Sequence, residues 1–384
     1  MMRRRWMWLV VGLVVVGMGV FLFRNQLLSQ VGVAVPQGAP GLAEVDVPDG
    51  FAVSVFAEGL AGPRFMTVGP DGTLFVAERG ANRVVALPDA DADGVADSQQ
   101  TVVENLDAPS SLAFRPGTNE LYIGEVSRVS RVRVDGLTAD EPEPVVTDLP
   151  ERRGHTTTTV AFGADEWLYV SRGSTCNVCE EADPRLAAVW RYRPDGTGGE
   201  LFMSGLRNAV GLALNPATGE LWASNNGRDL LGNNRPPETL YLLQQGEDAG
   251  WPRCHAGQIA DPEFGGDGAC TGVAQPIVTM QAHSAPLGLT FYDGAAFPSE
   301  YHGDLFIAFH GSWNRVPPTG YRVVRVPMED GRPAGDVVDF ATGWLQADGN
   351  SPGRPVDVVV ASDGALLVSD DKGGYIYHIA ATLP

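Results

Sequence analysis

Hydrophobic and polar positions alternate in short stretches along most of the chain, and one phrase recurs. The phrase begins with a turn containing Asp, Asn or Gly and continues with Leu or Trp, aromatic or aliphatic residues and a small residue. Because successive side chains of a strand point to opposite faces, each copy predicts a tight turn followed by a β-strand. Six copies are present, at residues 69–77, 117–124, 163–171, 216–224, 301–308 and 362–369.

The spacing of the copies predicts the architecture. The first three follow one another at intervals of about 46 to 48 residues, and later intervals are lengthened by insertions, chiefly Thr175–Leu186, Arg228–Pro237 and Arg253–Gln275. A repeat of this length, with room for four strands, is typical of a β-propeller blade. The sequence therefore predicts an all-β fold, a six-bladed β-propeller over residues 44–384, with the insertions as loops at one face.

The N-terminal segment is expected to lie outside the propeller. Three arginines, Arg3–Arg5, precede an uncharged run, Trp6–Phe23, whose length reaches the lower limit for a membrane span. The position of the arginines predicts that the body faces outward, on the periplasmic or extracellular side. We expect residues 1–24 to form a transmembrane anchor, with a cleaved signal peptide as the alternative. Residues 25–43 contain Pro and Gly but no aromatic residue, and predict a linker.

Charge and cysteine content narrow the classes of function. The chain has 27 Lys and Arg against 47 Asp and Glu, a net charge of −20, which argues against a nucleic-acid partner. Cys254 and Cys270 flank a glycine-rich loop and are expected to pair. Cys176 and Cys179 form a CxxC sequence followed by Glu180, so neither haem attachment nor a zinc site is indicated, and a local disulfide is expected.

An acidic turn at residues 90–97 offers side-chain oxygens at alternate positions, as calcium-binding turns do. It lacks the final bidentate Glu of an EF-hand. A calcium site and a solvated acidic hairpin tip are both open interpretations of this turn.

Several short motifs follow one another in the body. They are Gly154-His155, Gly205-Leu206-Arg207-Asn208, Asn225-Asn226-Gly227-Arg228-Asp229, Gly250-Trp251-Pro252-Arg253-Cys254, His310-Gly311-Ser312-Trp313-Asn314-Arg315, Gly353-Arg354-Pro355-Val356-Asp357 and Ser369-Asp370-Asp371. In this order they resemble the PQQ-dependent glucose/sorbosone dehydrogenases, six-bladed propellers that carry pyrroloquinoline quinone (PQQ) over the central channel. The resemblance extends from about Val47 to Ile379 and is closest to the sorbosone-dehydrogenase branch.

The resemblance implies that His155 is the general base of the reaction. Imidazole suits this role because its pKa lies near the working pH. The alternative is a structural histidine that binds a loop carbonyl. Glucose dehydrogenases of the family often carry an Asp directly before this histidine to orient it, whereas this chain has Gly154. The sequence therefore leaves the orienting partner of His155 open.

The resemblance also implies residues that hold PQQ. Arg207, Asn208 and Arg354 match cofactor-binding positions, and guanidinium groups are natural partners for the three carboxylates of PQQ. For Arg207 the alternative is an arginine that closes a blade through a local Asp. A second arginine, present in some members two residues after Arg354, is replaced here by Val356.

Further positions match the family more loosely. Gln281 and His283 fall where other members place residues that line the cofactor pocket. A family lysine near residues 310–311 has no counterpart here, and Arg315 is the candidate substitute. The tryptophans near the insertions are interpreted as blade-packing residues: Trp251, Trp313 and Trp344.

The loop that starts at Asn226 is the implied calcium site. In the family this loop gives a side chain to PQQ and main-chain carbonyls to calcium, which places the carbonyls of Gly227 and Arg228 as metal ligands and Asn226 as a cofactor ligand. Asp229 and Glu238 are candidates to brace the loop or the ion. Solvated loop charges are the alternative for these two.

The implied function is a PQQ-dependent sugar dehydrogenase. It would oxidise an aldose, or a sorbosone-like aldehyde sugar, by hydride transfer to PQQ and pass electrons to a membrane quinone or a cytochrome. Two alternatives use the same fold: a non-catalytic NHL-like binding module, and a calcium-dependent lactonase built on residues such as Asn208, Asn226 and Asp357. An axial funnel lined by arginines favours the dehydrogenase, and one lined by carboxylates favours the lactonase.

Overall fold

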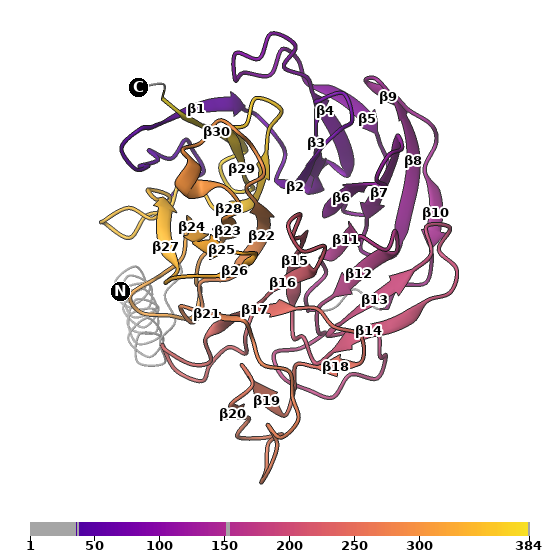
Figure 1. Ribbon diagram of the computed structural model, residues 1–384, viewed down its shortest axis with the longest axis vertical. Coiled ribbons are helices and arrows are strands. Elements are labelled where there is room, and N and C mark those ends of the chain that lie inside the picture. The colour runs from indigo at the N-terminus through magenta and orange to yellow at the C-terminus, as the bar shows by residue number, and fades with distance from the viewer. Residues whose placement is uncertain (1–35, 37, 151–153, 383–384) are drawn as a thin grey trace, which may run out of the picture.

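Six antiparallel sheets are arranged in a ring around a central axis (Figure 1). The computed structural model describes residues 36, 38–150 and 154–382. Each sheet has four main strands, ordered from the axis outward. This confirms the all-β, six-bladed β-propeller that the repeated phrase predicts.

The first three blades follow the order of the chain. Blade 1 contains β2 (Pro63–Val68), β3 (Leu74–Glu78), β4 (Arg83–Leu87) and β5 (Gln100–Val103). Blade 2 contains β6 (Ser111–Phe114), β7 (Glu120–Gly124), β8 (Val129–Asp135) and β10 (Glu143–Val146), with β9 (Thr138–Ala139) beside β8. Blade 3 contains β11 (Thr158–Phe162), β12 (Leu168–Arg172), β13 (Ala188–Tyr192) and β14 (Glu200–Ser204), and β18 (Glu247–Asp248) joins it in parallel.

The other three blades complete the ring. Blade 4 contains β15 (Ala209–Leu214), β16 (Leu221–Asn225), β17 (Glu238–Leu242) and β21 (Val278–Met280). Blade 5 contains β22 (Pro286–Phe291), β23 (Leu305–Phe309), β24 (Arg322–Val326) and β27 (Val338–Ala341). Blade 6 contains β28 (Pro355–Val360), β29 (Leu366–Asp370), β30 (Tyr375–Ala381) and β1 (Phe51–Ala57). Two small hairpins project from the blades: β19 (Cys254–His255) with β20 (Ile259–Ala260), and β25 (Met328–Glu329) with β26 (Arg332–Pro333).

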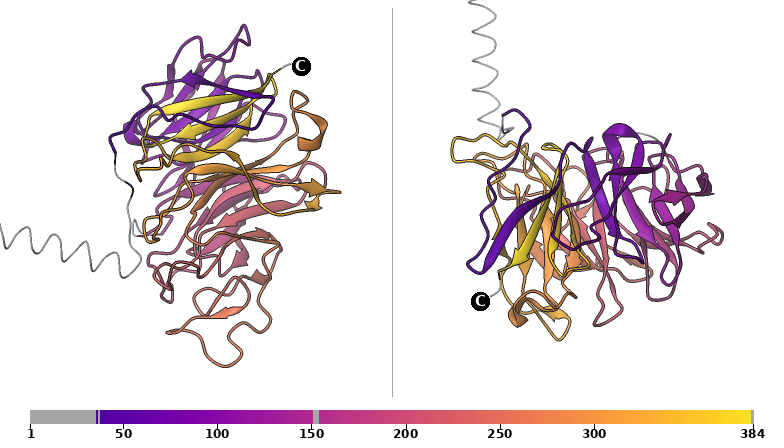
Figure 2. Two further views of the ribbon diagram at one scale, coloured as in Figure 1. Left: turned by 90° about the vertical axis from the view of Figure 1, so that its left-hand side faces the viewer. Right: turned by 90° about the horizontal axis from the view of Figure 1, so that it is seen from above.

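The ring is closed by the pairing of both ends of the described chain. Strand β1 is the outermost strand of blade 6 and runs antiparallel to β30 (Figures 1 and 2). The preceding residues also pack on the body, because Gly41 N donates to Pro352 O and Ala43 N donates to the Tyr377 hydroxyl. Ordered contacts thus begin within the last residues of the expected linker, 25–43.

Hydrophobic side chains fill the spaces between neighbouring blades. Because both faces of each sheet meet another sheet, residues of the repeated phrase are buried on both faces, as in β3, where all five residues are buried. A further cluster lies on the axis, made by one residue from each of four inner strands: Phe65, Val210, Leu287 and Val356. Burial between blades and on the axis is what holds the inner strands in place around the channel.

The antiparallel connections place two sets of loops at one end of the propeller, which we call the entry face. It consists of the segments that precede the inner strands and those that join the second to the third strand of each blade. Acidic residues at the ends of second strands fasten these segments: Glu78 accepts from Ala61 N and Asp370 accepts from Arg354 N. Buried carboxylates that bind backbone N–H groups hold the loops in fixed positions.

Helices are scarce, as the sequence predicts. The described residues contain only two 3₁₀ turns, η1 (Arg79–Ala81) and η2 (Ser299–Tyr301). Within the described part of the chain, no helix has the length and apolar character needed to cross a membrane. The anchor expected at residues 1–24 lies outside the described residues.

Candidate active site

The entry face brings together most of the residues that the sequence singles out. His155 precedes β11, Arg207 and Asn208 precede β15, Asn226 follows β16, and Arg354 precedes β28. They come from blades 3, 4 and 6. Their arrangement around the axis depends on the closure of the whole ring.

His155 is oriented by Ser174, which follows the second strand of the same blade. Its Nδ1 atom lies 2.9 Å from the Ser174 carbonyl oxygen and 3.1 Å from the Ser174 hydroxyl. A proton on Nδ1 therefore donates to the carbonyl, and Nε2 carries the lone pair. Burial, and then the charge of Arg207, lower the pKa of His155 to about 4, so the imidazole is neutral at pH 7.

Gly154 is required by the close approach of this loop to the next one. Its φ is +61°, and a Cβ atom at this position would lie 2.4 Å from the Thr175 carbonyl carbon. A side chain there would collide with the main chain of Ser174 and Thr175. An Asp at position 154 is therefore incompatible with this packing, and Ser174 takes over the orienting role.

Arg207 is buried and bound to the protein through all of its nitrogens. Nε and Nη2 donate to the backbone carbonyl and side-chain oxygen of Asn177, at 2.9 and 3.0 Å. Nη2 also forms an ion pair with Asp229 at 2.8 Å, and Nη1 donates to Asn226 O at 3.4 Å. These contacts match the alternative in which Arg207 closes a loop through a local Asp. Its positive charge still contributes to lowering the pKa of His155.

Asn208 and Asn226 lie side by side between His155 and blade 5. Asn226 N donates to Asn208 O at 3.0 Å, and its side chain donates to Pro286 O at 2.6 Å. A Cβ atom on Gly173 would lie 2.4 Å from Asn208 Oδ1 and 2.5 Å from His155 Cβ. The absence of a side chain at Gly173 therefore lets Asn208 and His155 approach each other.

Arg354 belongs to a charged cluster that joins blades 1, 5 and 6. Its Nε and Nη2 atoms donate to the carbonyls of His310 and Gly311, both at 2.9 Å. His310 Nε2 lies 3.0 Å from Asp371 Oδ1, and Arg64 Nη1 pairs with Asp371 Oδ2 at 2.8 Å. Burial lowers the pKa of His310 to about 4, despite the neighbouring Asp371.

Arg79 extends this cluster toward His155. It donates to the hydroxyl of Thr156, the neighbour of His155, at 2.9 Å. Burial, and then the charge of Arg64, lower the pKa of Arg79. Three half-buried arginines therefore lie near the Asp371 carboxylate, with which Arg64 forms an ion pair.

The sequence pointed to Arg354 in this cluster but missed Arg64 and Arg79. Arg64 and Asp371 are 307 positions apart and meet only because blade 1 closes against blade 6. Val356, which replaces an arginine of some family members, is fully buried in the axial cluster beside Phe65. The Arg64 guanidinium supplies a positive charge next to Arg354 from another strand.

The loop implied as the calcium site is fixed by Glu238. Gly227 N donates to Glu238 Oε2 at 2.6 Å, and Ala285 N, from the next blade, donates to Oε1 at 3.3 Å. Burial raises the pKa of Glu238 to about 7. The side chain of Arg228 points away from the axis and pairs with Asp261 and Glu263. Glu238 therefore braces the loop, and only main-chain atoms of Gly227 and Arg228 remain as candidate ligands.

The resemblance also implies roles for Gln281, His283 and Arg315 in or near the cofactor pocket. Their hydrogen bonds are with other segments and not with His155, Arg207 or Arg354. Gln281 is exposed and accepts from Arg322 on the outer part of blade 5, at 3.0 Å. His283 Nε2 lies 2.8 Å from Gly232 O. Arg315 donates to Asn233 O in the same loop as Gly232. Together they hold the segments around residues 226–237 and 310–321.

The expected cysteine pairs are both confirmed. Cys176 is bonded to Cys179, and Cys254 to Cys270. Trp251 and Trp344 are buried packing residues, as expected, whereas 45% of Trp313 is exposed. In the acidic turn, carboxylate oxygens of Asp89, Asp91 and Asp93 lie within 4.8 Å of one another, which leaves both interpretations of this turn open.

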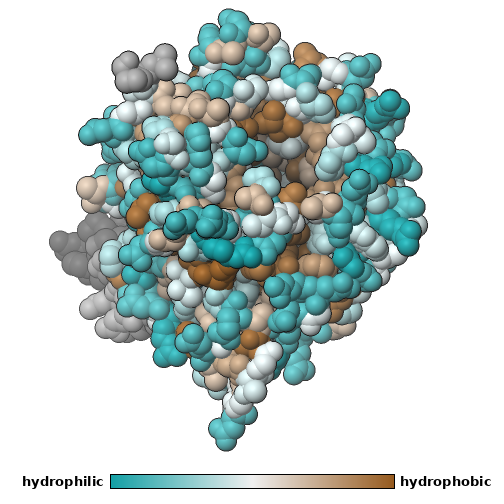
Figure 3. Space-filling model, viewed as in Figure 1, coloured by the Kyte–Doolittle hydropathy of each residue, from teal (hydrophilic) through white to brown (hydrophobic). Residues whose placement is uncertain are grey.

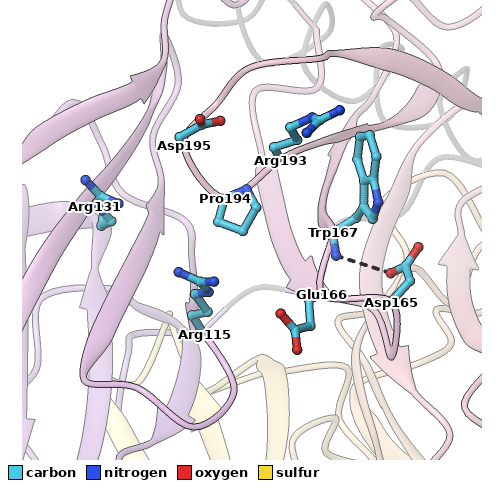
Figure 4. A pocket seen from close by; sticks show the side chains of 8 residues that line it. All are labelled: Arg115, Arg131, Asp165, Glu166, Trp167, Arg193, Pro194 and Asp195. Carbon is cyan, nitrogen blue, oxygen red and sulfur yellow. Dashed lines mark hydrogen bonds between the residues drawn. The ribbon is translucent and has the colours of Figure 1, made fainter.

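Cavities also lie away from the entry face. The axial channel holds a cavity of about 380 Å³ lined by inner strands, and Figure 3 shows a hollow with hydrophobic residues at its border near the middle of the molecule. A second cavity, of about 420 Å³, lies between blades 2 and 3 (Figure 4). Arg115, Arg131 and Arg193 border it together with Asp195 and Glu166. Glu166 follows β11 whereas His155 precedes it, so this cavity is at the opposite end of blade 3.

Known proteins resemble this chain in sequence and in fold. A PQQ-dependent pyranose dehydrogenase of Coprinopsis cinerea is 26% identical over 406 residues, which cover 88% of this chain and 54% of that protein. A PQQ-dependent sugar dehydrogenase of Hypocrea jecorina is 25% identical over 397 residues, 86% of this chain and 87% of that protein. This chain thus spans about half the length of the Coprinopsis enzyme and most of the Hypocrea enzyme.

Solved structures show the same propeller. The calcium structure of a Trichoderma reesei Carbohydrate-Active Enzymes Family AA12 protein matches with a TM-score of 0.78 at 22% identity, covering 91% of this chain and 100% of that one. The holo form of the pyranose dehydrogenase PQQ domain from Coprinopsis cinerea matches with a TM-score of 0.77 at 24% identity, covering 89% and 98%.

The family resemblance read from the motifs is confirmed by these relatives. The profile of the TrAA12-like family matches residues 45–258 and 254–382, which together span nearly the whole propeller. The chain therefore belongs to the TrAA12-like family.

Proposed function

We propose that the protein is a PQQ-dependent sugar dehydrogenase that oxidises an aldose, or a sorbosone-like aldehyde sugar, on its entry face. The observation that carries the proposal is the cluster of Arg64, Arg79 and Arg354 around Asp371, next to His155. In a chain with a net charge of −20, three arginines are gathered in one place at the entry face. Guanidinium groups gathered in one place favour a ligand with several negative charges.

The residues present fit PQQ, which carries three carboxylates. Arg64 Nε is buried and lacks a hydrogen-bond partner within the described ranges, so one donor of this cluster is left for a ligand. Burial of the Arg354 guanidinium lowers its pKa, because a buried charge is solvated less well than an exposed one. Arg64, Arg79 and Arg354 would therefore hold the carboxylates. Arg207, saturated by Asn177 and Asp229, would act through its charge and its loop.

The same cluster favours the dehydrogenase over the two alternatives. A lactonase needs carboxylates and amides that converge on calcium, whereas Asp357 lines the axial channel and accepts from Met66 N at 2.8 Å. The Asn226 side chain is engaged by Pro286 O. A binding module has no need of a half-buried neutral imidazole beside an arginine cluster.

His155 is proposed as the base that takes the hydroxyl proton of the sugar. The bond from Nδ1 to Ser174 fixes the tautomer that leaves Nε2 free to accept a proton. Bound PQQ supplies the acceptor for a hydride from the same carbon atom. Negative charge bound beside His155 raises the pKa of the imidazole and makes it a stronger base than in the cofactor-free protein.

Calcium is proposed to bind at the loop of Gly227 and Arg228, through main-chain carbonyl oxygens. Such oxygens are preferred by this hard cation. The brace from Glu238 to Gly227 N and Ala285 N keeps the loop in one conformation, which lowers the entropic cost of binding. Bound calcium would polarise the cofactor. No side chain of the loop would be needed as a ligand.

The electron acceptor is proposed to be a membrane quinone or a cytochrome, with the body held outside the membrane by residues 1–24. The uncharged run Trp6–Phe23 and the three preceding arginines support this placement.

The proposal is tested with the purified body in cofactor-free form, from Gly38 onward so that the contacts of Gly41 and Ala43 are kept. PQQ and calcium are added together with a panel of aldoses, and reduction of an artificial electron-accepting dye is followed. We expect turnover that needs both additions and is lost in His155→Ala. A folded protein that does not bind PQQ in a titration would refute the dehydrogenase and leave the binding module or the lactonase.

A further inference from the structure

A short disulfide-closed loop lies between the proposed base and the arginine of blade 4. Cys176 and Cys179 are bonded within the segment that joins β12 to β13, and both are partly exposed. The two residues between them are Asn177 and Val178. A covalent link across four residues restricts the backbone conformations open to this loop.

One side of the loop supports His155. The Ser174 hydroxyl donates to Cys176 O at 2.6 Å, so its oxygen is turned to accept from His155 Nδ1 at 3.1 Å. Ser174 O also accepts from His155 N at 3.0 Å. The position of the imidazole therefore depends on where the chain runs from Ser174 to Cys176.

The other side of the loop supports Arg207. Asn177 accepts from this arginine through both its carbonyl and its side-chain oxygen. The same side-chain oxygen accepts from Asp229 N at 2.8 Å, and Nδ2 donates to Asp229 O at 3.1 Å. Asn177 is thus fixed on two sides, and it fixes the arginine with two parallel contacts.

Loops from three different segments therefore share one support. The segments are the residues before β11, the residues before β15, and the loop after β16. Glu181 fixes the start of the disulfide-closed loop, because its carboxylate accepts from Thr175 N at 2.6 Å. Removing the disulfide frees the main chain at Cys176 and Asn177, where the bonds to Ser174 and Arg207 start.

We propose that Asn177, held by the Cys176–Cys179 disulfide, is a positioning residue that sets the geometry of His155 and Arg207 together. Reduction of this disulfide by a dithiol loosens both at once: two thiols form on the protein, and the dithiol becomes a cyclic disulfide. The inference rests on the proposed function where it concerns PQQ. The coupling between the loop and His155 is independent of any cofactor.

The test uses the folded body and three changes: Asn177→Ala, the double change Cys176→Ser with Cys179→Ser, and mild dithiol treatment of the wild type. Asn233→Ala is the matched control, because it truncates an asparagine in a neighbouring entry-face loop that binds Val316 O. Mass spectrometry after alkylation identifies which disulfide is reduced. Thermal unfolding shows that each sample is folded.

The main measurement is the NMR titration of His155 without cofactor. We expect the first three samples to move the titration midpoint upward by about half a pH unit or more, because a looser loop admits water to the imidazole. The control leaves the midpoint unchanged. Asn177→Gln, which keeps a neutral side-chain acceptor for Arg207, is expected to recover part of the wild-type midpoint.

PQQ titrations provide the second measurement. We expect dissociation constants about tenfold higher for Asn177→Ala and for the double cysteine change than for Asn233→Ala. Folded variants with the wild-type His155 midpoint would overturn the inference, whatever their activity. If the wild type itself binds no PQQ, the proposed function fails, but the His155 midpoints still decide whether Asn177 positions the imidazole.

Discussion

The Nδ1 atom of His155 lies 2.9 Å from the carbonyl oxygen of Ser174, so a neighbouring loop orients the proposed base. An acidic residue directly before the histidine could also orient the imidazole. In this chain the main chain of Ser174 and Thr175 lies too close to Gly154 for a side chain at that position. A neutral carbonyl fixes the tautomer without adding negative charge. The imidazole consequently keeps a low pKa in the cofactor-free protein.

The first prediction concerns the titration of His155. Its pKa of about 4 is below the ordinary value of 6.5, so the unfolded chain binds the proton first as the pH falls. The free energy of unfolding should therefore decrease between pH 6.5 and 4, with His155 contributing about 1–3 kcal/mol. Denaturation at several pH values should show a smaller decrease for His155→Gln. An NMR midpoint above 6 for the cofactor-free wild type would contradict this.

The second prediction concerns Gly154. Gly154→Ala should lower the free energy of unfolding by about 2–4 kcal/mol, because a positive φ and a backbone collision act together. Gly117→Ala is the matched control: its φ is +71°, but nothing lies within 4 Å of the added methyl group. Chemical denaturation of both variants separates the two effects. Equal losses of stability would mean that the loop at Thr175 moves aside.

The third prediction concerns Arg64. Arg64→Gln removes a buried donor and one positive charge from the cluster around Asp371, and should weaken PQQ binding about 10- to 100-fold. Arg133→Gln removes the same charge from an exposed position on β8 and should change the affinity little. Fluorescence titration of PQQ into both variants gives the comparison. If both substitutions weakened PQQ binding equally, Arg64 would act on PQQ through long-range charge and not through direct contact.

The fourth prediction concerns Asp357 in the axial channel. Burial raises its pKa to about 7, from a value near 4 in the unfolded chain, so the folded protein holds the proton more tightly. The stability that this proton provides is present at acidic pH and is lost as the pH rises through 7. Relative to wild type, Asp357→Asn should become more stable between pH 4 and 8 by about 2–4 kcal/mol. Parallel curves of unfolding free energy against pH would argue against this assignment.

The fifth prediction concerns Glu238 and calcium. Glu238→Ala leaves Gly227 N and Ala285 N without their acceptor, and should cost about 2–4 kcal/mol of stability. Calcium affinity, measured by calorimetry, should fall about tenfold because the loop is no longer held. Glu238→Gln keeps an acceptor and should retain most of both. Unchanged calcium binding in Glu238→Ala would place the ion elsewhere.

The fold was predictable because its signal is local and repeated. Each copy of the phrase contains its own turn and strand, so the blades could be counted before any contact between them was known. The outer strand of the last blade was harder to predict. Strand β1 contains no copy of the phrase and joins blade 6 through its pairing with β30. Ring closure is a long-range contact that no local pattern encodes.

The site was predictable where motifs precede inner strands and not where blades meet. His155, Arg207 and Arg354 each sit in a recognisable stretch at the start of a strand. No local sequence pattern indicates that Arg64 and Asp371 meet, because 307 positions separate them. The partner of Arg207 illustrates a further limit: Asn177 lies in an insertion whose path is set by a disulfide.

The most direct test of the account follows the fate of the substrate hydrogen. Protein loaded with PQQ and calcium is mixed without oxygen with an aldose carrying hydrogen or deuterium at C1, and the absorbance of the quinone is recorded in a single turnover. We expect a loss of quinone absorbance that is several-fold slower with deuterium, and slower by about 10² or more in His155→Ala. Bound PQQ whose spectrum is unchanged by every sugar of the panel would contradict it.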